Sequence, residues 1–374
     1  MIRRSHTDFP AGSALLAPIA GNKGIDMFEC TVNDEFDFEF AGGSFDDIRE
    51  ARALFDIALG ELWPIVRNAE MTGRAVPETE LDKIASAGRQ LALAVMAGFD
   101  DFVTELQEHG VGSVIMPSSM SDLRFPWALL RTADGRWLGE LVMIAGTRKG
   151  IKLLRLPKKE QEAPRGRATG DILAGYAEDD MLDCAVGRCD KGSRQALSAL
   201  EQLVSRSDID ILDPLGAGPL SPSDRDLMQE WLAESRSLFH FNAHNEGEDG
   251  AGSPRMRLSA GASASAQDLK NDIPVRAPVV LNICSSSKGR HADDNSFAGV
   301  LRHRRAPAVC STNGVITEEF GTAFAHALYD EAAKADHNLF EAVRKAQHRL
   351  YRETRHPMGY LYVFEGCTHQ SLRR

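Results

Sequence analysis

Long hydrophobic runs are missing from this sequence. No stretch reaches the roughly 18 consecutive apolar residues that a membrane helix needs, so we expect no membrane partner. The apolar segment nearest the N-terminus is short, follows Asp8 and Pro10, and is cut by Pro18. A segment interrupted in this way does not predict a signal peptide.

Cysteine is scarce and scattered. The six cysteines are spread over 374 residues without the spacing of a disulfide framework. Cys184 and Cys189 lack the close spacing of a zinc-binding pair, and no second pair matches them. These features predict reduced thiols in the cytoplasm and no metal ion.

An excess of positive charge is also absent. The 43 Lys and Arg residues are outnumbered by 54 Asp and Glu, which gives a net charge of -11. This balance argues against nucleic acid as the main partner. Residues 148–168 form a basic segment, which a solvated loop explains better than a nucleic-acid patch. The hydrophobic share of 43% and the length indicate a globular chain with a sizeable core.

The first 110 residues predict a hairpin followed by helices. Residues 1–25 look irregular, whereas residues 28–32 and 36–40 alternate apolar with polar side chains around Asn33-Asp34, as a β-hairpin does. Helical spacing predicts one helix over residues 46–70, kinked or broken at Pro64, and a longer one over 78–108. We divide the chain into a hairpin-plus-helix region at residues 1–79 and a main domain at 80–374.

From residue 112 onward, short apolar runs alternate with amphipathic helices. Few charges interrupt the runs, as expected for strands buried on both faces. We expect strands at residues 114–116, 141–144, 172–174, 209–212, 238–241, 279–283 and 308–310, and helices near 191–206, 222–234, 318–334 and 338–352. Residues 246–266 look like a mobile loop containing one short strand. The pattern predicts an α/β fold with a mostly parallel sheet and helices on both faces.

Two reactive side chains each follow a predicted strand. His244 comes just after the strand at residues 238–241, and Cys284 directly follows the strand at 279–283. Ligands bind beyond the carboxyl ends of parallel strands, so neighbouring strands would bring an imidazole and a thiol together. A thiol becomes a strong nucleophile when a base takes its proton, and histidine titrates near neutral pH. Taken singly, Cys284 is as well explained by a buried core cysteine and His244 by a loop histidine, whereas His240 is expected inside the sheet.

These segments resemble the paired His and Cys motifs of CHAT-domain proteases, in the caspase and separase group of clan CD. The motifs are FHFNAH at residues 239–244 and VLNICSS at 280–286. Three further segments follow the family's order: FPWALL at 125–130, DGRWLG at 134–139 and YVFEG at 362–366. The resemblance covers roughly residues 80–374.

The resemblance implies a caspase-like three-layer sandwich and a cysteine endopeptidase that needs no cofactor. Cys284 would attack the scissile carbonyl, and His244 would act as general acid and base. The backbone N–H groups of Cys284 and Asn245 would form the oxyanion hole. Asp293 and Asp294 could line a substrate pocket, although an exposed charged loop explains them equally simply. Relatives are often switched on by a partner or ligand in bacterial defence or signalling.

Two departures from the family pattern leave an alternative open. Asn245 stands where the family usually has glycine, and Ala128 stands where it has glutamate. The N–H of Asn245 remains available, but its conformation differs from that of a glycine. The alternative is therefore a catalytically inactive caspase-like scaffold that binds partner proteins.

Overall fold

The computed structural model describes residues 12–32, 35–117, 126–147, 184–187, 209–212, 218–234, 238–248, 254–259, 262–286, 296–334 and 338–366. The chain forms two compact units, each built from two segments of sequence. Unit 1 comprises Met1–Arg155 and Tyr351–Leu361, and unit 2 comprises Leu156–Leu350 and Tyr362–Arg374. Among the described helices, none is long and apolar enough to cross a membrane.

Unit 1 contains five paired strands, in the order β3-β2-β1-β4-β5. β1, β2 and β3 pair antiparallel, whereas β1, β4 and β5 pair parallel. Their bounds are Ser13–Ala20, Ile25–Val32, Phe36–Ala41, Ser113–Pro117 and Met143–Thr147. The predicted hairpin is confirmed as β2 and β3. The expectation of an irregular start is wrong, because residues 13–20 form a strand that accommodates Pro18 opposite Phe28.

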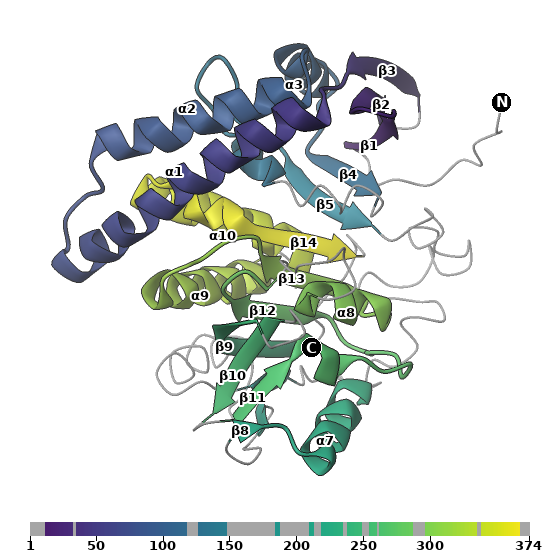
Figure 1. The fold of residues 1–374 in the computed structure, drawn as a ribbon, viewed down its shortest axis with the longest axis vertical. Helices are drawn as coiled ribbons and strands as arrows, with labels where there is room; N and C mark the ends of the chain where they lie inside the picture. Colours follow the sequence, from purple (N-terminus) through teal and green to yellow (C-terminus); the bar gives the residue numbers. More distant parts are fainter. Residues whose placement is uncertain are drawn as a thin grey trace. The chain divides into compact units, whose positions relative to one another are not determined.

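The three longest helices that lie wholly in unit 1 precede the short α4 (Leu138–Leu141), and Figure 1 shows α1 and α2 running side by side as a long pair. They are α1 (Phe45–Thr72), α2 (Glu78–Val95) and α3 (Phe99–Glu108). α1 continues through Pro64, so of the kink or break predicted there, the break is excluded. The single helix predicted over residues 78–108 is also wrong. The chain leaves the helix at Met96, which bridges to Gly42, and starts a new helix after Gly98.

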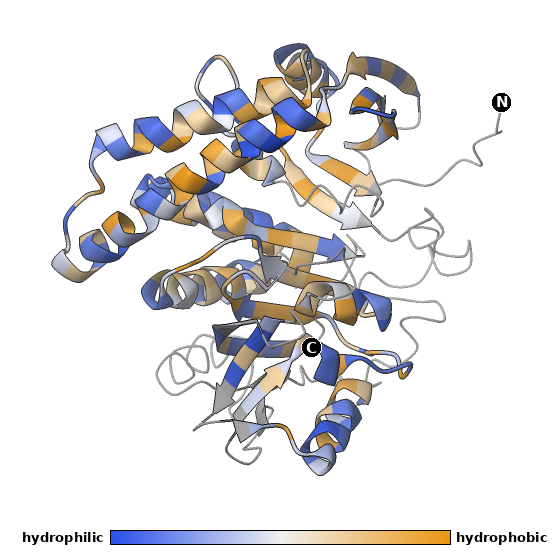
Figure 2. Ribbon diagram, viewed as in Figure 1, coloured by the Kyte–Doolittle hydropathy of each residue, from blue (hydrophilic) through white to orange (hydrophobic). Residues whose placement is uncertain are grey.

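Unit 2 is built on a mostly parallel sheet. β7, β6, β9, β12 and β13 pair parallel in that order, and β14 pairs antiparallel with β13. The bounds are Cys184–Gly187 for β6, Ile209–Leu212 for β7, Leu238–Glu248 for β9, Val279–Ile283 for β12, Ala308–Thr312 for β13 and Tyr362–Gly366 for β14. β12 and β13 are buried along their whole length, and both are largely orange in the hydropathy colouring of Figure 2.

Helices cover both faces of the unit 2 sheet. One face packs against α7 (Pro222–Ala233) and α8 (Phe297–His303) through a core that contains Phe239, Phe241 and Leu281. The other face meets α9 (Glu318–Lys334), whose Tyr329 contacts His240, and α10 (Leu339–Thr354). α7 begins at the N-cap Ser221, as the Ser-Pro-Ser-Asp sequence indicates. The predicted α/β fold with a mostly parallel sheet is confirmed.

The segment after β9 departs from the prediction. Residues 254–259 and 262–265 form β10 and β11, and β9 itself extends to Glu248. β11 also pairs with the short strand β8 (Gly218–Pro219). The one short strand expected within residues 246–266 is confirmed as β10. The rest of the expected mobile loop also contains β11, whose small residues give no strong strand signal, and the end of β9. The strand expected at 172–174, the helix at 191–206 and the basic segment at 148–168 lie outside the described residues.

Arg304 is a buried anchor at the end of α8. Its side chain is 1% exposed, and it donates to the carbonyl oxygens of Ile273 at 2.8 Å and Leu269 at 3.0 Å. It also donates to Oε1 of Gln229 on α7. Burial lowers the pKa of this guanidinium to about 10. Arg304 thus joins two helices and the segment that leads into β12.

Candidate functional site

His244 and Cys284 lie at equivalent positions on neighbouring strands. β9 and β12 pair parallel from Phe239 opposite Val279 to Ala243 opposite Ile283. His244 and Cys284 are the next residues on each side. Neighbouring strands lie about 4.8 Å apart, so this register brings the two backbones close together.

The alternation of side chains indicates which face the two residues share. Phe241, Ala243 and Ile283 point into the core beneath α7 and α8. The intervening positions face α9: His240 contacts Tyr329, and Asn282 donates to the carbonyl oxygen of Gly321. Because successive strand residues alternate, positions 244 and 284 belong to the α9 face.

The turn after β12 holds Cys284 through several contacts. The thiol donates to the carbonyl oxygen of Ile316 at 3.2 Å, and the Ile316 N–H points back at Sγ from 3.5 Å. Ser285 adopts a φ of 53°, a region that non-glycine residues rarely occupy. Its N–H donates to the carbonyl oxygen of Gly314 at 2.8 Å. The segment between β13 and α9 therefore fixes both the nucleophile candidate and the residue that follows it.

The resting thiol is protonated. Burial raises the pKa of Cys284, and N–H groups of Ile316 and of Cys284 itself offset only part of that rise. His244 is exposed, whereas Cys284 is half-buried. A base must therefore remove the thiol proton before Cys284 can act as a nucleophile at neutral pH.

A layer of hydrogen-bonded polar side chains lies two residues earlier on the same two strands. Asn282 donates to Oδ1 of Asn242 at 2.9 Å and to the carbonyl oxygen of Gly321 at 3.0 Å. Its Oδ1 accepts from the Tyr362 hydroxyl at 2.6 Å. Nothing in the sequence pattern singled out this carboxamide, because Asn inside an apolar run carries no motif of its own.

His240 occupies the interior, as expected. It is fully buried, contacts the Tyr329 hydroxyl through Nδ1, and burial lowers its pKa to about 3. A neutral imidazole held in this way supports the sheet and takes no part in proton transfer near pH 7.

Asn245 makes side-chain contacts that sequence reasoning missed. Its Nδ2 donates to the carbonyl oxygen of Cys284 at 2.8 Å, and its Oδ1 accepts from the Gly247 N–H at 2.8 Å. The sequence reasoning assigned Asn245 only a backbone role. An amide that reaches a residue 39 positions away leaves no signal in local sequence.

Asp293 and Asp294 lie outside the described residues, so their assignment to a substrate pocket stays a prediction. Within the described ranges, no group of three or more His, Cys, Asp or Glu side chains is arranged to hold a metal ion.

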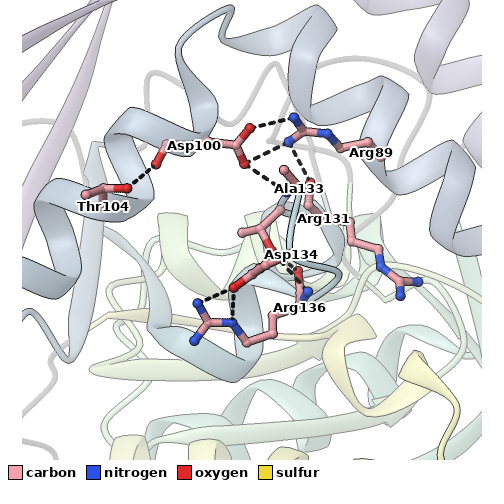
Figure 3. Close-up of polar contacts among 8 residues, drawn as sticks. Arg89, Asp100, Thr104, Arg131, Ala133, Asp134 and Arg136 are labelled. Atoms are coloured by element: carbon pink, nitrogen blue, oxygen red, sulfur yellow. Dashed lines mark hydrogen bonds and ion pairs between the residues drawn. The ribbon is translucent and has the colours of Figure 1, made fainter.

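The turn between the FPWALL and DGRWLG segments lies in unit 1, and Figure 3 shows the polar contacts that fix it. Arg89 of α2 pairs with Asp100 of α3 at 2.5 Å and donates to the carbonyl oxygen of Arg131. Asp100 also accepts from the Ala133 N–H at 2.9 Å. Asp134 lies next to this turn. Hydrogen bonds, of which the one from Arg136 has the largest effect, lower the pKa of its carboxyl group to about 2. These contacts join two helices to one turn, so the residues that make them have a structural role.

A family model describes most of the chain. The CHAT domain model matches residues 88–369. The chain belongs to the CHAT domain family. The resemblance of the His and Cys segments to this family is thereby confirmed at the level of the domain. No curated protein sequence matches the chain.

Solved structures of low sequence identity share the fold. Separase of Saccharomyces cerevisiae, in its complex with securin, is 11% identical with a TM-score of 0.58 and covers 95% of this CHAT chain. The match spans 30% of the separase chain. The Arg-specific cysteine proteinase gingipain R (RgpB) of Porphyromonas gingivalis is 12% identical with a TM-score of 0.47, covering 75% of this chain and 69% of its own. The likeness to separase shows a shared fold.

Proposed function

We propose that this CHAT chain is a cysteine endopeptidase with Cys284 as nucleophile and His244 as general acid and base. The parallel register of β9 and β12 carries the proposal, because positions 244 and 284 are the next residues on each strand where this pairing ends. β12 ends there, whereas β9 continues to Glu248. The alternation of side chains supports the same pairing, since it assigns both positions to the α9 face.

In the proposed first half-reaction, the Cys284 thiol proton passes to His244 as Sγ bonds to the scissile carbonyl carbon. The tetrahedral intermediate then collapses, the C–N bond breaks, and His244 gives the proton to the leaving amine. In the second half-reaction water attacks the thioester and gives a proton to His244. The C–S bond breaks, the acid product leaves, and the proton returns to Cys284.

Backbone N–H groups of Cys284 and Asn245 are proposed to bind the oxyanion. The N–H of Phe239 donates to Pro278 on the β12 side of β9. Because backbone groups alternate along a strand, the N–H of Asn245 is directed to that same side, where Cys284 lies. Donors aimed at the developing negative charge stabilise the tetrahedral intermediate.

The substrate proposed here is a specific protein, and a partner or ligand is proposed to regulate its cleavage in bacterial defence or signalling. Support for a protein partner comes from separase, a protein of the same fold that is in complex with securin. The cytoplasmic setting is likewise a proposal, supported by the sparse, scattered cysteines.

Labelling with a cysteine-reactive peptide warhead tests this function. Cys284 should label fastest, Cys284→Ala should remove that label, and His244→Ala should slow it by about 10²-fold near pH 7. Cys310, fully buried on β13 with its pKa raised by burial, serves as the internal control. If Cys284 labels no faster than the other thiols, the inactive scaffold becomes the better description.

A further inference from the structure

The side chain of Asn245 connects the strand that carries His244 to the turn that carries Cys284. Nδ2 of Asn245 donates to the Cys284 carbonyl oxygen, while Oδ1 accepts from the N–H of Gly247 two residues further along β9. Each contact measures 2.8 Å, the length of a well-formed hydrogen bond. The second contact fixes the rotation of the amide, so the donor faces Cys284.

The peptide group after the nucleophile candidate is held at both ends. Its carbonyl accepts from Asn245, and its N–H, which belongs to Ser285, donates to Gly314. Because a peptide group is planar, fixing its oxygen and its N–H fixes the plane. The φ of 53° at Ser285 needs such support, since L-residues leave this region unless their surroundings hold them there.

We infer that Asn245 is a positioning residue whose side-chain amide holds the Cys284 turn in register with His244. A glycine, which the family pattern places here, could make neither bond. The contact to Cys284 is independent of catalysis; only its effect on thiol chemistry rests on the proposed function. Asn245 therefore contributes through its amide as well as through its backbone.

Selective isotope labelling can observe this contact directly. Protein carrying 13C at the Cys carbonyl and 15N at Ser gives correlations only for Cys-Ser pairs, which occur at Cys284-Ser285 and Cys310-Ser311. Asn245→Asp keeps the acceptor for Gly247 and removes the donor, and Asn245→Gly removes both. We expect the Cys284 carbonyl resonance to move in both variants while the Cys310 correlation stays in place.

The outcomes decide the inference in either direction. An unmoved Cys284 resonance in both variants would overturn it. Loss of the Cys310 correlation in both would overturn it as well, because a role confined to the Cys284 turn leaves β13 intact. Asn271→Asp, which changes another turn asparagine that accepts from Ile273 N–H, is the matched control and should move neither resonance.

Thiol alkylation by iodoacetamide separates positioning from folding. If Asn245 keeps Cys284 beside His244, the pH at which Cys284 becomes reactive should rise in Asn245→Gly, which removes the contact without adding a charge. Its rate near pH 7 should then fall by up to about tenfold, the equivalent of one hydrogen bond. A pH profile identical to the unmodified protein refutes the positioning role. The Cys284 carbonyl resonance can move in the Asn245 variants while His244→Ala still reacts with iodoacetamide at the normal rate. That result would support the Asn245 contact and reject the proposed peptidase function.

Discussion

The buried carboxamide of Asn282 allows a sharp test of the sheet beneath the candidate site. In Asn282→Asp one oxygen still accepts from the Tyr362 hydroxyl. The other replaces an NH₂ group that lies 3.0 Å from the Gly321 carbonyl oxygen and 2.9 Å from Oδ1 of Asn242. The substitution keeps shape and volume and turns two hydrogen bonds into contacts between acceptors.

Each buried acceptor left in such a contact costs ~1–3 kcal/mol, so the ionised variant should lose about 2–6 kcal/mol of unfolding free energy. Burial disfavours the carboxylate and raises its folded pKa above the unfolded value of roughly 3.9. A protonated carboxyl can donate again. The stability of Asn282→Asp is therefore retained below about pH 4 and is lost as the pH rises through the folded-state pKa of the new carboxyl group.

Thermal unfolding followed by circular dichroism from pH 3.5 to 8 measures this difference against the unmodified protein. Asn271→Asp, the same chemical change at a partly exposed turn, should unfold with the unmodified protein at every pH. Tyr362→Phe should be destabilised at all pH values without the pH dependence. If Asn282→Asp is as stable at pH 7.5 as the unmodified protein, the reasoning about this hydrogen-bond layer fails.

Three further pairs of substitutions test other parts of the fold. Arg304→Met leaves three buried acceptors without a donor and should cost ~3–5 kcal/mol in denaturant unfolding, while the exposed neighbour Arg305→Met should change little. Gly43→Ala places a Cβ 1.8 Å from a backbone oxygen and should destabilise the protein. Gly60→Ala, in open space on α1, should instead raise the free energy of unfolding by ~0.5–1 kcal/mol. Ser285→Gly should preserve or slightly increase stability and Ser285→Val should reduce it, since φ is 53° there; equal unfolding midpoints would contradict this.

Capping residues and apolar runs in the sequence predicted several helices and strands correctly. The predictions failed where contacts between distant residues determine the structure. α7 follows from Ser221 and Pro222, and β12 and β13 follow from unbroken apolar runs. β1 was missed because Pro18 suggested irregular chain, yet a strand tolerates proline where no ladder bond is needed. The break between α2 and α3 depends on the bridge from Met96 to Gly42, which no helical periodicity reveals.

The site shows the same division. The sequence predicted that His244 and Cys284 each follow a strand. This is confirmed for Cys284 but wrong for His244, which lies within β9, although β9 and β12 are indeed neighbours with a matching register. Their catalytic roles stay a prediction, as does the division of the chain at residue 79. The contacts of Cys284 with Ile316 and of Asn245 with Cys284 could not be predicted, because each joins loops more than 30 residues apart.

The pairing of β14 with β13 has a consequence for biosynthesis. Tyr362, the first residue of β14, supplies the hydroxyl that satisfies Asn282, although the two are 80 positions apart in the chain. A nascent polypeptide that has emerged only as far as β13 would expose that edge of the sheet and leave the carboxamide without this donor. The ribosome must therefore translate past residue 366 before β14 can pair with β13 and the hydrogen bonds of Asn282 are complete.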